Sequence, residues 1–330
     1  MARTTYLEAI REAQMEEMQR DERVFMMGED IICNVFGTTT GFADMFGKER
    51  VRDTPISENG FIGAAAGAAM VGMRPIVDAT IASFLYPAMD QICSIIAKSR
   101  YIYGGQATLP LVIRSSLFYG NSNAAQHSDR PYPMFMNMPG LKIMVPSNAY
   151  DMKGLMKSAV RDDDPVLIFE DSTCWTSKMD LPDDPDFMVP LGEADIKREG
   201  TDVTVIGVGG GVNLALKAAE ALEKDGISLE VVDPRSLVPL DRDTILASVR
   251  KTGRAICVDP AHETCSAASE IAAIIAEHAF PSLKGPVLRV ATAQTHLPFS
   301  PPIEKALYPT VDRIVAAARQ LVGVDQKTPA

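Results

Sequence analysis

The chain has 330 residues, with 46% hydrophobic and 23% charged residues and a formal net charge of −11 at pH 7. This length can hold two domains with full cores, and the composition is that of an ordinary globular protein. The acidic balance argues against nucleic acid or an anionic membrane surface as the main partner, and no apolar run is long enough to cross a bilayer.

The cysteine content and the N-terminal residues indicate the cellular compartment in which the protein is expected. The five cysteines (Cys33, Cys93, Cys174, Cys257 and Cys265) are an odd, scattered set without a CxxC motif. Neither a disulfide framework nor a zinc site is therefore expected. The chain begins directly with an amphipathic pattern and lacks the apolar core of a secretory signal. We expect a cytoplasmic protein with reduced thiols.

The first half of the chain alternates helices with short apolar strands. The predicted helices are an opening helix containing residues 6–13 with Thr4 or Thr5 as its cap, a Gly- and Ala-rich helix after Glu58, and helices over 87–104 and 150–160. The predicted strands cover 24–28, 74–79, 109–114, 142–146 and 165–170. This alternation implies a mainly parallel sheet covered on both faces.

A long loop over residues 117–135 lies within this half of the chain. Such a loop inside a compact domain more often has a function than not.

An acidic, proline-rich stretch separates the two halves. It contains Asp-Leu-Pro-Asp-Asp-Pro-Asp, which cannot form regular structure, so we place a linker at 181–196 between domains 1–180 and 197–330. Beyond it, predicted strands at 203–208, 229–232, 255–258 and 287–290 alternate with predicted helices at 213–224, 241–251, 267–279 and 310–321. The predicted fold class is α/β, with two three-layer domains built on mainly parallel sheets.

Glu58 stands where a turn meets the Gly- and Ala-rich helix. The helix carries no charge before Arg74, so we expect it to be buried, and its thin side chains let other backbone approach closely. A glutamate at its start is either a functional group or an N-terminal cap, because acidic residues are common in a first helical turn.

Three other features allow more than one interpretation. The glycines over 207–211 follow a strand and open a helix, which fits a dinucleotide-binding turn but fits an ordinary tight turn better. His127 lies in a polar loop, where a histidine is usually only solvated. Arg114, at the end of an apolar strand, either anchors a substrate carboxylate or pairs with an acid.

Short motifs accumulate in a fixed order along nearly the whole chain. They are Gly28-Glu29-Asp30, Asp53-Thr54-Pro55-Ile56-Ser57-Glu58, Arg74-Pro75-Ile76, Asp90-Gln91-Ile92, Ala97-Lys98-Ser99-Arg100-Tyr101, Gly105-Gln106, Gln126-His127-Ser128, Pro139-Gly140-Leu141-Lys142, Pro146-Ser147, Lys153-Gly154-Leu155, Asp164-Pro165, Phe169-Glu170, Asp233-Pro234-Arg235, Pro239, Asp243-Thr244-Ile245, Lys251-Thr252-Gly253-Arg254 and Pro298-Phe299-Ser300-Pro301-Pro302. In this order they resemble the β subunit of the thiamin-diphosphate-dependent 2-oxo acid dehydrogenase (E1) components, a transketolase-like family that includes pyruvate, branched-chain and acetoin dehydrogenases.

The resemblance implies an α2β2 heterotetramer with a β–β contact, in which thiamin diphosphate lies between an α and a β subunit. The two domains then correspond to a pyrimidine-binding domain and a transketolase C-terminal domain. In this family the α subunit holds Mg²⁺ and the diphosphate, which accounts for the missing Gly-Asp-Gly…Asn motif in this chain.

The resemblance also assigns roles to single residues. Glu58 matches the carboxylate that hydrogen-bonds the aminopyrimidine, and Phe84 matches the aromatic ring that packs on the aminopyrimidine. Ile56 precedes Glu58 along the same wall of the site. His127 matches the histidine at the mouth that serves substrate binding and acyl transfer, and Arg114 stays a candidate for the substrate. A monovalent cation, K⁺, is implied at Leu109, Leu111, Val112, Ala159, Asp162 and Asp164, although residues 162–164 can equally be a solvated charge run.

The implied function is that of an oxidoreductase that decarboxylates a 2-oxo acid, or cleaves an acyloin, and passes the acyl unit to the lipoamide of an E2 acyltransferase. Departures from the family pattern, such as Asp129-Arg130-Pro131 after His127-Ser128, leave the substrate and the acceptor open. The alternatives are a carboligase or split transketolase-like enzyme, a non-catalytic assembly subunit and, more distantly, a nicotinamide-dependent reductase.

Overall fold

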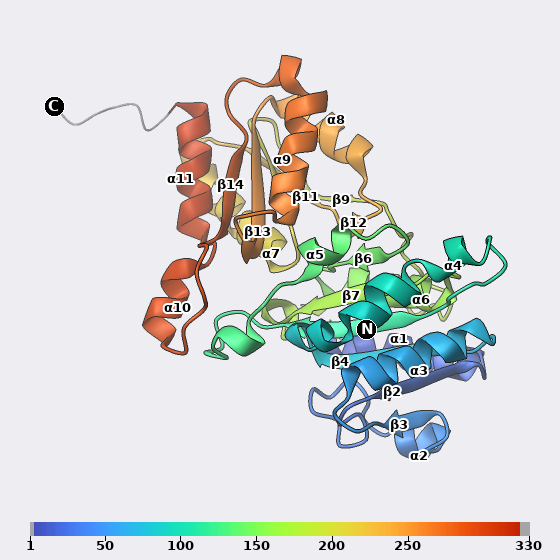
Figure 1. The fold of residues 1–330 in the computed structure, drawn as a ribbon. Helices are drawn as coiled ribbons and strands as arrows, with labels where there is room; N and C mark the ends of the chain where they lie inside the picture. The colour runs from blue at the N-terminus through green and yellow to red at the C-terminus, as the bar shows by residue number, and fades with distance from the viewer. Residues whose placement is uncertain (1–2, 324–330) are drawn as a thin grey trace. The chain divides into compact units, whose positions relative to one another are not determined.

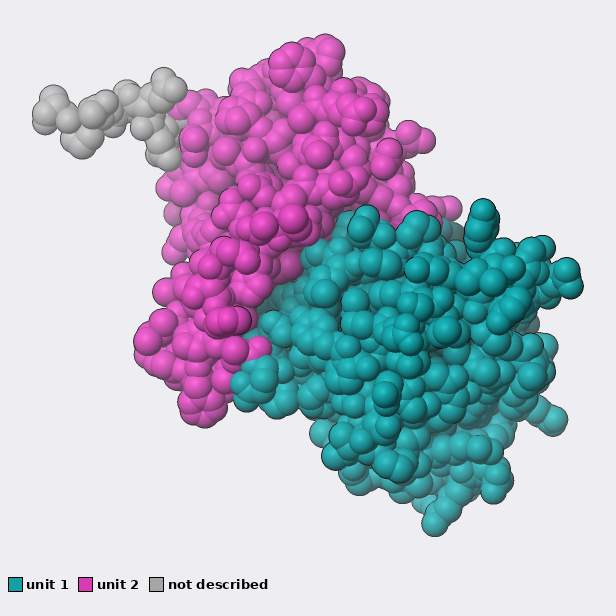
Figure 2. Space-filling model, in the orientation of Figure 1, with its two compact units in different colours: residues 1–119, 126–191 teal, residues 120–125, 192–330 magenta. Residues whose placement is uncertain are grey.

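The computed structural model describes residues 3–323, which form two compact units. Figure 2 colours the first unit, residues 3–119 and 126–191, teal and the second unit, residues 120–125 and 192–323, magenta. The chain passes from one unit to the other after Leu191, inside the stretch that the sequence suggests as the linker. Within the described range no helix has both the length and the apolar character to cross a membrane.

The first unit is built on a parallel sheet with the strand order β6-β7-β5-β4-β2-β3 (Figure 1). The strands are β2 (Val24–Gly28), β3 (Val51–Asp53), β4 (Arg74–Ile81), β5 (Val112–Leu117), β6 (Lys142–Met144) and β7 (Val166–Asp171). A short antiparallel pair, β1 (Thr4–Thr5) and β8 (Lys178–Met179), lies apart from this sheet. Because the strands are parallel, their carboxyl ends meet at one edge, and the candidate site residues follow these ends.

The helices of the first unit cover this sheet. They are α1 (Tyr6–Arg20), α2 (Phe42–Phe46), α3 (Glu58–Met70), α4 (Ser99–Ile102), α5 (Tyr132–Met136) and α6 (Ala149–Arg161). Thr5 caps α1 in a reciprocal pair with Glu8, which confirms the predicted cap. Buried side chains of α1 and α6 pack with those of β2, β4, β5 and β7 in one core.

The predicted helix over 87–104 is not one regular helix. The chain forms a 3₁₀ helix η1 (Ala82–Ala88), a π-helical turn η2 (Gln91–Ile96) and then α4. Pro87 lies inside η1 and has no N–H for a helical hydrogen bond, and in η2 the Ala97 N–H donates to the Ile92 carbonyl five residues back, at 2.9 Å. The prediction of a continuous helix is therefore wrong here, and Phe84 is placed on η1.

The second unit has a sheet of order β14-β13-β10-β11-β9, in which only β9 runs antiparallel to its neighbour. Its strands are β9 (Asp195–Arg198), β10 (Val203–Gly207), β11 (Leu229–Asp233), β13 (Ala255–His262) and β14 (Leu288–Thr292), with a short β12 (Ser236–Val238). Its helices are α7 (Gly210–Leu222), α8 (Arg242–Thr252), α9 (Ala267–His278), α10 (Pro301–Leu307) and α11 (Val311–Val322). Since α7 and α11 share one core with the sheet and α8 and α9 another, the unit has the predicted three layers.

The glycine-rich turn after β10 illustrates why glycine is required there. Gly209 has φ 52°, and a Cβ on Gly207 would lie 2.6 Å from the Val212 nitrogen. Both positions exclude a larger residue because β10 must turn at once into α7. The interpretation of these glycines as a tight strand-to-helix turn is confirmed.

Candidate active site

Glu58 is the first residue of α3 and is half-buried. The residue at the N-cap is Ser57, so Glu58 does not occupy the cap itself. Only one face of α3 is covered, because Phe61, Ile62 and Ala65 are buried whereas Gly60, Ala64 and Gly67 are exposed. The expectation of a fully buried helix is wrong for the isolated chain, in which the thin face of α3 is open.

Glu29, the residue directly after β2, lies near enough to Glu58 for the two charges to interact. Its Oε1 is buried without a hydrogen-bond partner among the described residues. Burial, followed by the negative charges of Glu58 and Asp30, raises the pKa of Glu29. Two carboxylates thus share a region that water reaches only in part.

Phe84 and His127 face each other. Their ring centroids are 5.5 Å apart with an interplanar angle of 78°, which is an edge-to-face contact, and both side chains are half-buried. The His127 Nδ1 is buried and has no hydrogen-bond partner in the part of the chain that the structure describes. An imidazole nitrogen in this state is available to a ligand.

Ile56, two residues before Glu58, is 84% exposed. Fully burying such a side chain contributes about 1.5–3 kcal/mol, so its exposure leaves an apolar contact unused. The structure thus brings Phe84 to His127 and Glu58 to Glu29, and it leaves Ile56 open to solvent.

Arg114 is paired with two acids inside the sheet. It is 1% exposed, its Nε and Nη2 donate to Glu170 at 2.5 and 2.9 Å, and its Nη1 donates to Asp78. Every nitrogen of the guanidinium is occupied, because strands β4, β5 and β7 place these three side chains next to one another. Of the two interpretations of Arg114, the structure shows the pairing with an acid.

The residues suggested for a monovalent cation have partners within the chain. Among their carbonyls, Leu109 accepts the Leu111 N–H at 2.8 Å, and Leu111 accepts the Val166 N–H at 2.9 Å. The other suggested groups also have partners: Ala159 accepts the Asp162 N–H, Val112 belongs to the β5 ladder, Asp162 pairs with Lys142, and Asp164 pairs with Lys142 and Arg100. With cationic side chains already on the carboxylates, the charge-run interpretation is favoured, and we do not propose a K⁺ site.

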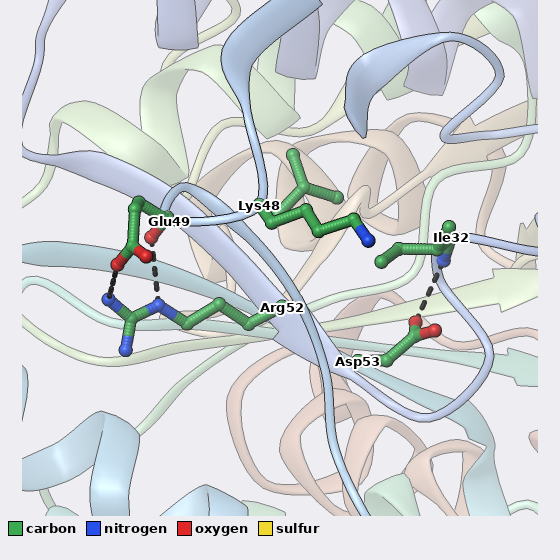
Figure 3. Close-up of a pocket in the computed structure, with 6 residues that line it drawn as sticks. Ile32, Lys48, Glu49, Arg52 and Asp53 are labelled. Carbon is green, nitrogen blue, oxygen red and sulfur yellow. Dashed lines mark hydrogen bonds and ion pairs between the residues drawn. The ribbon is translucent and has the colours of Figure 1, made fainter. Parts of the chain in front are cut away.

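A surface hollow of ≈ 370 Å³ lies beside β3 but contains none of the predicted site residues (Figure 3). Asp53 at its edge accepts the Ile32 N–H at 2.8 Å, and Arg52 donates to the Glu49 carbonyl at 2.8 Å. Asp53, which opens the motif before Glu58, therefore holds the loop after β2 in place.

Sequence reasoning missed Glu29 as a site residue. The signal was present, since an acid directly after a buried parallel strand lies at the edge where ligands bind. Gly28 strengthens it, because a Cβ there would lie 2.2 Å from the Asp78 carbonyl oxygen, so β2 and β4 approach too closely for any other residue.

Comparison with known proteins identifies the family. Residues 2–173 match the transketolase pyrimidine-binding domain, and residues 192–314 match the transketolase C-terminal domain. The chain belongs to the transketolase-like family. It is 44% identical to the acetoin:2,6-dichlorophenolindophenol oxidoreductase subunit beta of Bacillus subtilis (strain 168), over 96% of both chains.

Two further members of this family from the same organism are equally similar. The 2-oxoisovalerate dehydrogenase subunit beta is 45% identical over 97% of this chain and 99% of the relative. The pyruvate dehydrogenase E1 component subunit beta is 42% identical over 98% and 99%. A solved structure described as a split gene transketolase, inactive beta4 tetramer, shares the fold with a TM-score of 0.79 at 24% identity, over 98% of this chain and 100% of that chain.

Proposed function

We propose that this chain is the β subunit of a thiamin-diphosphate-dependent 2-oxo acid dehydrogenase E1 component that works with an α subunit. Relatives with this β-subunit role are 42–45% identical over nearly the full length of both chains. The proposed product of the reaction is an acyl unit passed to the lipoyl group of an acyltransferase.

The observation that carries the proposal is a set of polar groups withdrawn from water without partners. Glu29 Oε1 and His127 Nδ1 are both buried and unpaired among the described residues, and Glu58 lies beside Glu29. A buried polar atom left unpaired costs about 1–3 kcal/mol, so such atoms are expected where a ligand completes them. A carboxylate, an aromatic ring at Phe84 and an imidazole fit the aminopyrimidine end of thiamin diphosphate.

When bound, thiamin diphosphate supplies the carbon nucleophile for the substrate carbonyl and accepts the electron pair left by decarboxylation. Glu58 would hold a proton at the aminopyrimidine ring nitrogen. Phe84 would cover one face of that ring and exclude water, and His127 would bind the substrate oxygen through Nδ1. The chain lacks a Gly-Asp-Gly…Asn motif, so we assign the diphosphate and Mg²⁺ to the α subunit.

The open face of the first unit supports a partner at this place. Ile56 is 84% exposed, and the exposed residues of α3 next to it include Gly60, Ala64 and Gly67. A helix face of such small residues lets another backbone approach closely. We assign this face to an assembly contact, with the α subunit or between β subunits of an α2β2 heterotetramer.

The test is co-expression with an α-type chain and assay of the purified complex with pyruvate, 2-oxoisovalerate and acetoin, with and without thiamin diphosphate. We expect turnover of one of these that requires thiamin diphosphate. Glu58→Gln should lower kcat by about 10²–10⁴-fold with assembly intact, because it removes the acid that holds the proton. Glu49→Gln, on a side chain that is 95% exposed, is the matched control. Full turnover by Glu58→Gln would remove Glu58 from the mechanism.

A further inference from the structure

Glu304 is a buried carboxylate that the proposed function does not use. It lies on α10, is 1% exposed, and has both of its oxygens occupied within the second unit. Its Oε2 accepts the Ser122 N–H at 3.0 Å, and its Oε1 accepts the Tyr308 hydroxyl at 3.0 Å. Burying a carboxylate is costly, so its place in the interior calls for a reason beyond packing.

The helix that carries this carboxylate is firmly placed. The motif at residues 298–302 leads into α10, whose first positions are prolines and need no N–H. At the other end of the helix the Leu307 carbonyl accepts the Ala293 N–H at 3.0 Å, and the Tyr308 carbonyl accepts a hydrogen bond from Arg313 Nη1 at 3.0 Å. These bonds join α10 to the residue after β14 and to α11, so the carboxylate projects from an anchored helix.

The loop segment that this carboxylate holds, residues 120–125, contains two residues in the left-handed region. Ser122 and Ala124 both have φ 57°, and neither is glycine. Such backbone is strained and persists only where surrounding contacts hold it. The carboxylate holds it at Ser122, and just beyond the segment the Ser83 hydroxyl donates to the Gln126 carbonyl at 2.6 Å. The strained residues therefore lie between two hydrogen bonds.

His127 follows this segment directly, on the single 3₁₀ turn η3 (Ala125–His127). We propose that Glu304 is a positioning residue that holds segment 120–125 in its strained conformation and so fixes where this turn begins. Without the hydrogen bond from Ser122, the left-handed residues relax and the turn moves. The His127 imidazole then loses its edge-to-face contact with Phe84.

Hydrogen exchange of the full chain, followed by mass spectrometry, measures the hold on the segment. Glu304→Met removes the carboxylate and keeps a side chain of similar length, so the amides of residues 118–127 should exchange about tenfold faster. Glu304→Gln should restore the parental rate, because its amide oxygen accepts the Ser122 N–H and its amide nitrogen donates to the Tyr308 oxygen. Lys305→Met, at the exposed neighbour on α10, is the matched control. Unchanged exchange in Glu304→Met, or faster exchange throughout the second unit, would overturn the proposal.

NMR of the full chain with isotope-labelled histidine follows the imidazole itself, because the chain has four histidines. His127→Gln assigns the signal, and Phe84→Leu gives its position without the ring current of Phe84. We expect Glu304→Met to move the His127 ring-proton signal toward the Phe84→Leu position, and Glu304→Gln and Lys305→Met to leave it in place. The signal of His278, on α9, should not move in any of them. An unchanged His127 signal in Glu304→Met would contradict the positioning.

The kinetic test uses the complex with the α subunit and rests on the function proposed above for His127. Because small displacements of a positioned group are costly, we expect Glu304→Met to lower kcat/KM about tenfold, with Glu304→Gln and Lys305→Met at the parental value. An activity loss without a change in loop exchange or in the His127 signal would overturn the positioning. If both of these change while activity stays at the parental value, the positioning stands and the role proposed for His127 fails.

Discussion

The first unit contains two groups of polar side chains that differ in how far their hydrogen bonds are satisfied. Asp78, Arg114 and Glu170 are buried and bonded to one another, with both oxygens of Glu170 taken by Arg114. At the candidate site, by contrast, Glu29 Oε1 and His127 Nδ1 are buried and unpaired among the described residues. The two groups therefore differ in how completely their polar atoms are paired within the chain.

Free energy explains why the two groups differ. Taking charges out of water costs several kcal/mol per ion, and only good geometry with all hydrogen bonds made offsets that cost. The Arg114 group meets this condition inside the chain. The site group does not, and under the function proposed above the missing partners would come from a bound ligand.

Arg114→Met is the sharpest test of the first half of this comparison. It leaves Asp78 and Glu170 close together in a buried place with no cation, which is expected to lower the free energy of unfolding by about 3–5 kcal/mol. Urea unfolding of the variant measures the loss. Arg52→Met, on a side chain that is 53% exposed, is the control and should change stability by about 0.5 kcal/mol or less. A loss as small as that of the control would show that the Arg114 group is not structural.

His127→Gln tests the second half of this comparison, the unpaired site group. Here we expect the activity to fall and the stability to change little. We expect the free energy of unfolding to fall by about 1 kcal/mol or less, because only the edge-to-face contact with Phe84 is lost and the imidazole Nδ1 has no partner to lose within the described chain. Activity of the complex with the α subunit should fall about 10²-fold, as for loss of a group that binds or protonates the substrate. His278→Gln, in the second unit, is the control for changing a histidine. A variant that unfolds easily but retains activity would place His127 with the structural group.

The same comparison shows what could be predicted from the sequence. Alternating strands and helices predicted the α/β class and the layers, because hydrophobic periodicity is local. Arg114 could not be assigned, since its partners are 36 and 56 residues away and come together only when β4, β5 and β7 pair. An arginine at a strand end looks the same in the sequence whether or not its partners are present.

Irregular elements limited the prediction in the same way. The stretch over 87–104 has helical periodicity, but Pro87 and the π-helical turn η2 interrupt it, and neither changes the pattern of apolar residues. Glu58 and Phe84 were named through family motifs, whereas the carboxylate beside Glu58 was found only in the structure. Tertiary proximity of Glu29 to Glu58 has no local signature, because 28 residues and a strand separate them.

Glu29→Gln gives the smallest effect and sharpens the comparison through its pH dependence. Burial and the charge of Glu58 raise the pKa of Glu29 in the folded chain, so ionising this carboxyl costs more in the folded state than in the unfolded state. This cost is absent when the pH is below the pKa of Glu29 in the unfolded chain. It grows as the pH rises to the higher pKa of Glu29 in the folded chain, and it is constant above that. The glutamine has a similar shape and never ionises. The variant should therefore melt about 1–2 °C higher than the parent at pH 7, with the difference disappearing toward pH 4.

Thermal unfolding between pH 4 and pH 7 measures this difference in melting temperature, and Glu49→Gln serves as the control for the change in net charge. A variant less stable than the parent at pH 7 would mean that Glu29 is satisfied within the chain and belongs with Glu170.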